Sequence, residues 1–268
     1  MKKALIALTC IVCILCILAG KLHWEKKIDK TVEDAKSSVQ SVHAEERTNS
    51  PADENHSDDL SKLTANFPES LSEKVLNAVQ EGETISIVAM GSDATVSGEG
   101  TWTNRLQQRL NEAYGEGVFQ LTVKSYGDDL SIEVVQQQKY EEVADLKPDI
   151  LLLEPFVLND NGLVAIENTL DSVEIIINAV KHASEDAVIM LQPPNPIHNA
   201  TYYPAQVEAL QNYAEEQGII YLNHWTNWPE QTSEDILNYL NEETNTPNEK
   251  GHEVWAEYLA KYFTGEEI

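Results

Sequence analysis

Short apolar stretches alternate with longer amphipathic ones from about Pro68 to the end of the chain. Five of the stretches are short, aliphatic and nearly free of charge, which predicts buried strands. They cover residues 84–90, 118–124, 149–153, 187–191 and 219–222. The stretches between them repeat apolar residues every three or four positions, which predicts helices. This alternation predicts a five-stranded parallel sheet with helices on both faces, that is, an α/β fold with three layers, α/β/α.

Three stretches of the chain show the helical pattern, one before the first strand and two between strands. Before the first strand, Leu71, Val75 and Val79 share one helix face, and Gly82 is expected to end that helix. The other two apolar faces are Trp102, Leu106, Leu110 and Tyr114, and then Ile132, Val135 and Val143 on one helix after the second strand.

The N-terminus has a different pattern, in which Lys2 and Lys3 precede a continuous apolar run over residues 4–20. No small-residue cleavage site comes after the run, so residues 1–24 are predicted to be an uncleaved transmembrane signal anchor. We expect a single-pass protein of the cell membrane with its domain outside the cytoplasm, because a signal-like N-terminus commonly exports the rest of its chain. The positive-inside rule favours the opposite orientation, because lysines also lie after the run: Lys21, Lys26, Lys27 and Lys30.

Residues 25–66 are predicted to form a polar, partly helical stem and then a disordered acidic linker. Apolar residues line one face of the predicted stem helix and allow weak self-association: Ile28, Val32, Val39 and Val42. Because the seam covers only about two heptads, an ordinary solvated helix is the alternative. Residues 67–268 are predicted to form the folded domain.

Charge and composition limit the partners of the chain. The formal net charge is −27, and a surface this acidic repels nucleic acid, so we expect no nucleic-acid partner. The cysteines all lie in the apolar run, so the domain has neither a disulfide nor a thiol nucleophile: Cys10, Cys13 and Cys16. No phosphate-binding glycine motif and no histidine pair with metal spacing occurs, so we expect no cofactor and no metal.

The first strand breaks at Gly91, a residue type that tolerates sharp turns, and Ser92, Asp93 and Thr95 come directly after it. Loops at the carboxyl ends of the strands of a parallel sheet open at the same edge, where ligands commonly bind. We therefore expect the polar residues of these loops to meet: 91–100, 125–129, 154–162, 192–203 and 223–229, with 242–252 in reach.

Four short motifs in these loops resemble those of the SGNH/GDSL hydrolases, in order and over residues 84–263. Residues 91–95 resemble the family's Gly-Asp-Ser-x-Thr, residues 125–127 its second block, and residues 157–160 its Gly-x-Asn-Asp block. Residues 243–252 match the frame of its last block, Asp-x-x-His-Pro-Asn-x-x-Gly-His, and residues 195–204 are typical of firmicute members. The resemblance implies a flavodoxin-like sheet of the SGNH hydrolase type.

The resemblance also implies a reaction, the hydrolysis of an ester by acyl transfer to a serine. The substrate class would be an O-acyl group on a surface glycan or lipid. The predicted catalytic residues are Ser92 as nucleophile, Asp93, and His252 as base. Gly127 and Asn159, with the amide of the residue after the nucleophile, would bind the oxyanion.

Two departures from the family pattern leave the reaction open. Serine and aspartate are transposed, so Asp93 stands in the nucleophile's column, and Thr246 stands in the column of the catalytic histidine. A serine needs a base, and His198 and His224 are possible substitutes for one. The alternative is a catalytically degenerate binding protein with an aromatic-lined cleft from Tyr202, Tyr203, Trp225 and Trp228. A third hypothesis is a structural partner that associates through the stem.

Overall fold

The computed structural model describes residues 59–268. The predicted anchor, the self-association seam and most of the linker lie outside this range and stay predictions. Within residues 59–268, no helix is long and apolar enough to cross a bilayer.

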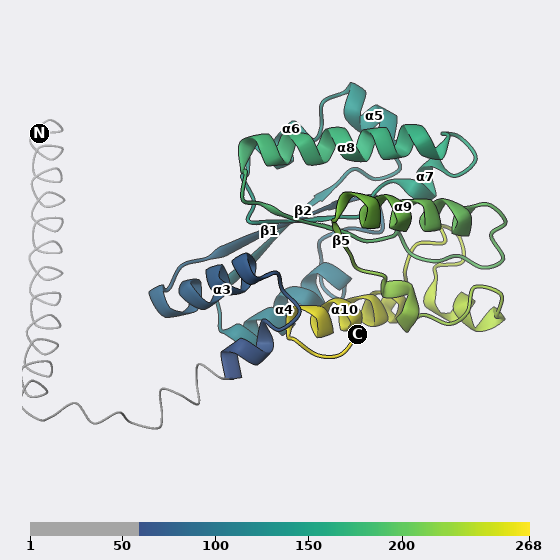
Figure 1. The fold of residues 1–268 in the computed structure, drawn as a ribbon. Helices are drawn as coiled ribbons and strands as arrows, with labels where there is room; N and C mark the ends of the chain where they lie inside the picture. The colour runs from purple at the N-terminus through teal and green to yellow at the C-terminus, as the bar shows by residue number, and fades with distance from the viewer. Residues whose placement is uncertain (1–58) are drawn as a thin grey trace, which may run out of the picture. The chain divides into compact units, whose positions relative to one another are not determined.

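A sheet of five parallel strands forms the centre of the domain, in the order β2-β1-β3-β4-β5 (Figure 1). All neighbouring strands run parallel, and Ile87 of β1 pairs with Leu121 on one side and Ile150 on the other. The strands are β1 (Ile85–Gly91), β2 (Phe119–Ser125), β3 (Ile150–Leu153), β4 (Val188–Leu191) and β5 (Ile220–Tyr221). The predicted fold class, with five parallel strands at these positions, is confirmed.

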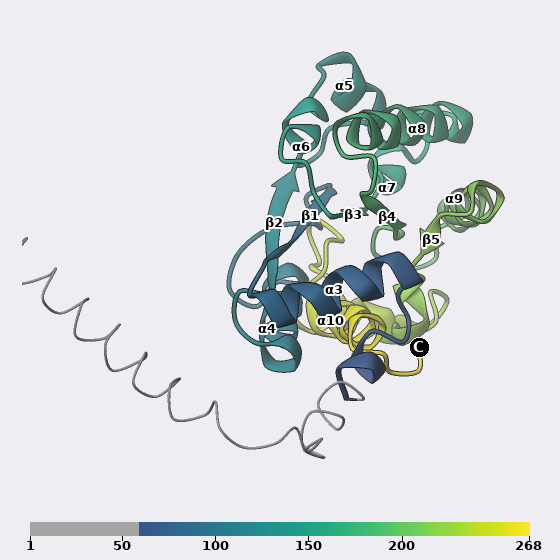
Figure 2. The ribbon, with the colours of Figure 1, turned by 60° about the vertical axis from the view of Figure 1, so that its left-hand side comes forward.

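Helices cover both faces of the sheet and make three layers (Figures 1 and 2). One face carries α3 (Glu69–Glu81), α4 (Trp102–Tyr114) and α10 (Glu249–Phe263). The other carries α5 (Ser131–Gln136), α6 (Glu141–Ala144), α7 (Val157–Asp160), α8 (Ile166–Ala183) and α9 (Tyr203–Gln217). Two 3₁₀ segments, η1 (His224–Asn227) and η2 (Glu234–Tyr239), connect β5 to α10. Each face of the sheet therefore has its own apolar core.

The helix boundaries depend on local sequence signals. Gly82 ends α3 in the left-handed conformation at φ 70°, as predicted. Asn248 caps α10, because its side-chain oxygen accepts hydrogen bonds from the amides of Lys250 and Gly251. The predicted apolar face of α4 is buried: Trp102, Leu106, Leu110 and Tyr114.

The helix predicted after the second strand is wrong in one respect, because it is two short helices, α5 and α6. Gln138 lies between them with φ 55°, a left-handed conformation that cannot continue a right-handed helix. The break also changes which side chains face the core. Val134 and Val143 are fully buried, whereas the predicted Ile132 and Val135 are half-buried.

The domain begins earlier than residue 67, because part of the predicted linker packs on it. Leu60 is 8% exposed and belongs to the apolar core. The Tyr114 hydroxyl donates to the Leu63 carbonyl, and the Asn66 side chain donates to the Tyr262 carbonyl. Residues 59–66 thus contact α4 through Tyr114 and α10 through Tyr262.

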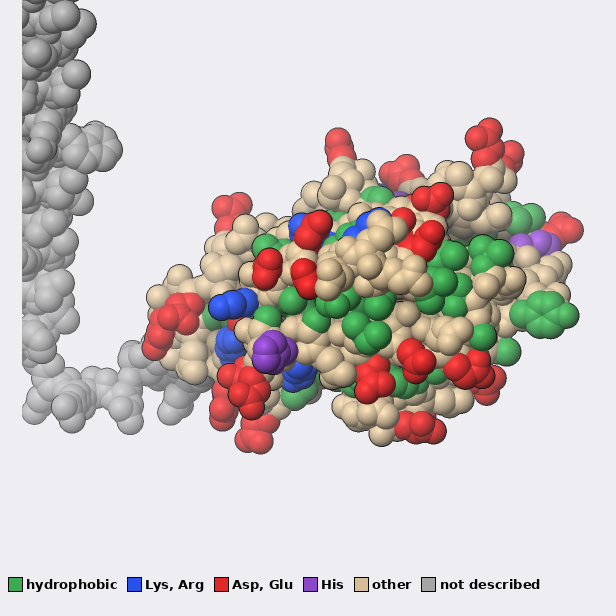
Figure 3. Space-filling view, turned by 90° about the horizontal axis from the view of Figure 1, so that it is seen from above, with side chains coloured by type: hydrophobic (Ala, Val, Ile, Leu, Met, Phe, Trp, Pro, Cys, Tyr) green, Lys and Arg blue, Asp and Glu red, His purple; other side chains and the backbone are tan. Residues whose placement is uncertain are grey.

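Acidic side chains predominate among the charged groups of one face (Figure 3). Seen from above, the face that carries α5, α6 and α8 shows many Asp and Glu side chains and few Lys or Arg (Figure 3). This distribution disfavours anionic partners.

Candidate active site

Ser92 faces the interior at the turn after β1. It is 2% exposed, and its amide and hydroxyl both donate to Oε2 of Glu154, at 2.8 and 2.9 Å. The Thr95 hydroxyl donates to the same oxygen at 2.8 Å. The Ser92 hydroxyl in turn accepts a hydrogen bond from the Ala94 amide. These contacts tie the β1 turn to the end of β3.

Glu154 was not among the candidate residues from the sequence, and it is central to this site. Its side chain is fully buried, and that burial raises the pKa of its carboxyl group to about 8. The hydrogen bonds from Ser92 and Thr95 oppose the rise in pKa, and the negative charge of Asp93 adds to it. Its place in the sequence could have indicated a site residue, because Glu154 comes directly after the four aliphatic residues of β3, at the carboxyl end of a strand.

Gly91 is needed for space and not for a left-handed turn, which corrects the reason given from the sequence. Its φ is not among the positive values of the described glycines. A Cβ atom on Gly91 would lie 2.3 Å from Oε2 of Glu154 and 2.6 Å from Oγ1 of Thr95. Only a residue without a side chain lets Glu154 approach the turn.

Gly91→Ala is expected to destabilise the domain by about 2–3 kcal/mol, because overpacking a rigid buried site forces its neighbours apart. Urea unfolding followed by circular dichroism measures this loss. Gly127→Ala is the matched control, since a Cβ there meets nothing within 4 Å and only the positive φ of 61° opposes it. That control should cost about 1 kcal/mol. Equal losses would show that Gly91 is not held by contact with Glu154.

Asp93 has the exposed side chain of the turn. Partial burial raises the pKa of its carboxyl group above the ordinary value, and the negative charge of Asp128 adds to the rise. A carboxylate thus stands at the position where the family motif has its nucleophile.

The predicted oxyanion hole is occupied by the chain itself. The Asp93 amide donates to the Gly127 carbonyl at 2.9 Å, and Nδ2 of Asn159 donates to the same oxygen at 3.1 Å. Nδ2 of Asn159 also donates to the Asp129 carbonyl at 2.9 Å. Gly127 therefore contributes its carbonyl, and not its amide, at the point where the other two donors converge. A substrate oxygen can reach these donors only after this carbonyl moves away.

His252 caps a helix. Its Nδ1 accepts a hydrogen bond from the Trp102 amide at the start of α4, at 3.3 Å. Burial lowers the pKa of its imidazole to about 4, and the positive charge of Arg105 contributes to the lowering. His252 is thus neutral at pH 7, and its Nδ1 is already engaged.

His224 is a core residue. Its Nε2 donates to the Pro193 carbonyl at 2.8 Å, and its Nδ1 accepts from Nε1 of Trp228 at 2.9 Å. The imidazole stacks on Trp255 with ring centroids 4.0 Å apart, and burial lowers its pKa to about 3. Both nitrogens are used inside the protein, so His224 has no free position for proton transfer.

His198 and Thr246 complete the candidate positions. Nε2 of His198 lies 3.0 Å from Nδ2 of the neighbouring Asn199. Thr246 accepts a hydrogen bond from Asn241, on a loop that also holds Thr244. Within residues 59–268, none of His198, His224 and His252 is a hydrogen-bond partner of Ser92. The structure thus pairs Ser92 with Glu154 by hydrogen bonds, and with none of these three histidines.

Comparison with solved structures decides the fold family. A GDSL-family lipolytic protein from Desulfitobacterium hafniense matches with a TM-score of 0.55 and 17% identity, over 67% of this chain and 99% of that one. This chain has the SGNH/GDSL hydrolase fold. The hydrolase LAE5 from the metagenome of Lake Arreo, Spain, matches with a TM-score of 0.57 and 14% identity, over 69% of this chain and 97% of that one. A family 3 carbohydrate esterase from Talaromyces cellulolyticus matches with a TM-score of 0.56 and 14% identity, over 66% of this chain and 95% of that one. No protein-family model and no curated protein matches the sequence.

The predicted aromatic wall is not one surface of this SGNH/GDSL fold. Tyr203 and Trp228 are buried, and the Tyr203 hydroxyl donates to the Asn195 carbonyl. Trp225 is half-buried, and its Nε1 donates to the Pro194 carbonyl at 2.7 Å. Of the four predicted aromatic residues, Tyr202 is exposed, at 75%.

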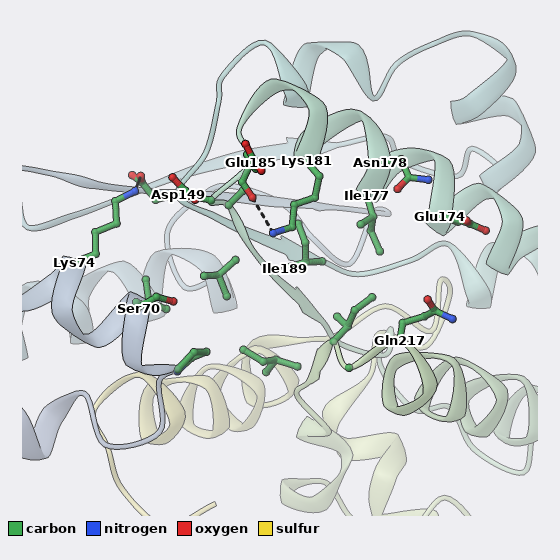
Figure 4. Close-up of a pocket in the computed structure, with 18 of the residues that line it drawn as sticks. Ser70, Lys74, Asp149, Glu174, Ile177, Asn178, Lys181, Glu185, Ile189 and Gln217 are labelled. Carbon is green, nitrogen blue, oxygen red and sulfur yellow. Dashed lines mark hydrogen bonds and ion pairs between the residues drawn. The ribbon is translucent and has the colours of Figure 1, made fainter.

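Three hollows of the described surface lie away from the β1 turn, since neither Ser92 nor Asp93 lines any of them. One of about 820 Å³ lies at the opposite edge of the sheet, where β4 and β5 begin. Figure 4 shows the Lys74 side chain beside the Asp149 carboxylate in this hollow. It also shows the Lys181 side chain, which lies above Ile189 and donates a hydrogen bond to the Glu185 carbonyl. This mixed-charge hollow contains none of the predicted site residues.

Proposed function

We propose that this domain binds an acylated glycan at the carboxyl edge of its sheet and does not transfer the acyl group through Ser92. The observation that carries the proposal is the double hydrogen bond to the Gly127 carbonyl, from the Asp93 amide and the Asn159 side chain. Acyl transfer to serine needs free donors for the developing oxyanion. Here two of the three predicted donors are already engaged.

Charge at the same point supports binding over catalysis. Asp93 and Asp128 are both exposed, and negative charge near an oxyanion would raise the energy of the transition state. Carboxylates, in contrast, are good acceptors for the hydroxyl groups of a sugar.

The structural neighbours suggest the ligand class. Their names include an acetyl esterase, a family 3 carbohydrate esterase and an acetyl-xylooligosaccharide esterase. Because identities of 14% support the fold alone, an acylated glycan is a proposal for this chain and not a transferred property.

Ester hydrolysis is the second candidate function, and one observation favours it. The Ser92 hydroxyl lies 2.9 Å from Glu154, whose carboxyl group has a pKa raised to about 8. In its ionised form, which this pKa makes the minor form at pH 7, the carboxylate is within reach of the proton that it would abstract. Burial of both side chains opposes the idea, since substrate has to contact the nucleophile.

Purified full-length chain is expected to release no p-nitrophenol from p-nitrophenyl acetate, and no acetate from acetylated xylo-oligosaccharides, beyond the rate of the Ser92→Ala variant. Ser97→Ala is the matched control, because Ser97 is exposed on the same loop. Acetate release that disappears in Ser92→Ala and persists in Ser97→Ala would overturn the proposal and establish ester hydrolysis. Calorimetric titration with the same oligosaccharides tests the binding directly.

A further inference from the structure

A hollow of about 320 Å³ lies between two loops at the carboxyl edge of the sheet. One loop leads from β4 into α9, and the other lies between η1 and η2, after β5. The Asn199 amide donates to the Gln231 carbonyl at 3.0 Å and so ties the loops together. The residues that line the hollow are Asn199, Ala200, Pro204, Glu230, Gln231 and Thr232.

The lining suits a ligand with several hydroxyl groups. Asn199 and Gln231 offer amide donors and acceptors, Glu230 a carboxylate and Thr232 a hydroxyl. Oε1 of Gln231 is buried and has no hydrogen-bond partner among residues 59–268. A buried acceptor without a partner costs free energy, and a ligand hydroxyl or a water would satisfy it.

Tyr202 is an exposed aromatic residue on the loop that supplies Asn199 and Ala200 to this lining, although it does not itself line the hollow. It lies in the chain between Ala200 and Pro204, and 75% of it is exposed, although α9 begins at the next residue. An aromatic side chain offers a rigid apolar face with a polar end. Such a face matches the C–H face of a sugar ring, while the amides and the carboxylate match its hydroxyl groups.

We propose that this hollow is a subsite for one uncharged sugar residue of the glycan. The inference rests on the proposed function and adds the position and chemistry of a second contact. An uncharged sugar is favoured over an anionic one, because Glu230 lines the hollow and the chain carries a formal net charge of −27.

The position of the subsite fits one ligand that also reaches Asp93. β4 lies two positions from β1 in the sheet, and strands are spaced by about 4.8 Å, so the carboxyl ends of these two strands are roughly 10 Å apart. A ligand that extends from one of these strand ends to the other is longer than a single small ester, as an oligosaccharide is.

Calorimetric titration of the full-length chain tests the subsite with xylo-, cello- and chito-oligosaccharides and with acetylated xylo-oligosaccharides. For an oligosaccharide that binds the wild type, Tyr202→Ala and Gln231→Ala are each expected to weaken binding about tenfold, which is about 1.4 kcal/mol. Tyr202→Phe keeps the ring and should bind within about twofold of wild type. Leu163→Ala is the matched control, because Leu163 is 74% exposed on the loop before α8 and does not line the hollow.

The outcomes separate this inference from the proposed function. Binding that survives Tyr202→Ala and Gln231→Ala but is weakened by Asp93→Asn overturns the subsite and leaves glycan binding at the edge intact. No binding of any of these oligosaccharides to the wild type overturns both. Thermal melts of each variant show whether weaker binding comes from unfolding, and a Tyr202→Ala variant that melts as wild type but binds tenfold less supports the subsite.

Discussion

Glu154→Ala is expected to lower the free energy of unfolding by about 3–5 kcal/mol, one of the two largest effects that the structure predicts. The substitution leaves a cavity at a fully buried position at the end of β3. It also leaves the Ser92 amide and the Thr95 hydroxyl without their acceptor. Urea unfolding at pH 6 measures the loss. Glu142→Ala is a control for an exposed glutamate, and should change stability by less than about 1 kcal/mol.

The same carboxyl group makes stability depend on pH in a defined direction. The pKa of Glu154 is about 8 in the folded protein and near its ordinary value of 4.5 in the unfolded chain. Between these values the folded state holds a proton that the unfolded state has released. Stability therefore falls as pH rises through this window, by up to about 1.4 kcal/mol per pH unit.

The interval from pH 7.5 to 8.5 separates the effect of Glu154 from that of the buried histidines. The pKa values of His224 and His252 are lowered to about 3 and about 4 in the folded protein, whereas the ordinary value is 6.5. Both residues therefore reduce stability as pH falls through 6.5, and they contribute little above pH 7.5. Glu154→Gln keeps the size of the side chain and removes its titration. We expect the melting temperature of the wild type to drop between pH 7.5 and 8.5, and that of Glu154→Gln to stay level. The same drop in both proteins would rule out Glu154 as its source.

Trp255→Ala is expected to lower the free energy of unfolding by about 3–5 kcal/mol. The indole is fully buried, between Trp102 at a ring-centroid distance of 5.1 Å and His224 at 4.0 Å. Its Nε1 donates to Gln192 at 2.9 Å. The substitution removes both stacked contacts and the donor at once, and urea unfolding measures the sum.

Trp225→Ala is the matched control for Trp255→Ala. Trp225 belongs to the neighbouring 3₁₀ segment, is half-buried and donates its indole hydrogen bond to the Pro194 carbonyl. Its loss should cost about 1–2 kcal/mol, since less apolar area leaves water on folding. Equal losses for Trp225→Ala and Trp255→Ala would mean that the stack with Trp102 and His224 adds nothing to stability.

The Trp255 stack also holds the imidazole of His224 in the core. α10 supplies Trp255, α4 supplies Trp102, and the segment after β5 supplies His224. These elements meet because their apolar faces pack on one side of the sheet. A sequence pattern places His224 after a strand, but only packing decides whether its ring turns to the ligand edge or to the core.

The assignment of residues to strands and helices was predictable because it depends on patterns among neighbouring residues in the sequence. The period of apolar positions distinguishes strands from helices, and Gly82 ends α3 through its own backbone freedom. Alternation of the two periods then restricts the fold to a parallel three-layer domain. The motifs after β1, β2 and β3 located loops of the candidate site for the same reason, since each of these loops begins where a strand of the sheet ends.

The direction of side chains and peptides at that site depended on contacts between distant segments. Ser92 turns inward because Glu154, 62 residues away, accepts its hydrogen bonds. The Gly127 carbonyl faces Asp93 and Asn159 because three loops meet there. The alternation of strands and helices along the chain, and the loops that gather at one edge, could be read from the sequence alone. The order of the strands in the sheet and the break between α5 and α6 could not. Which groups at that edge remain free to bind depended on the tertiary structure, since burial and long-range hydrogen bonds leave no local pattern.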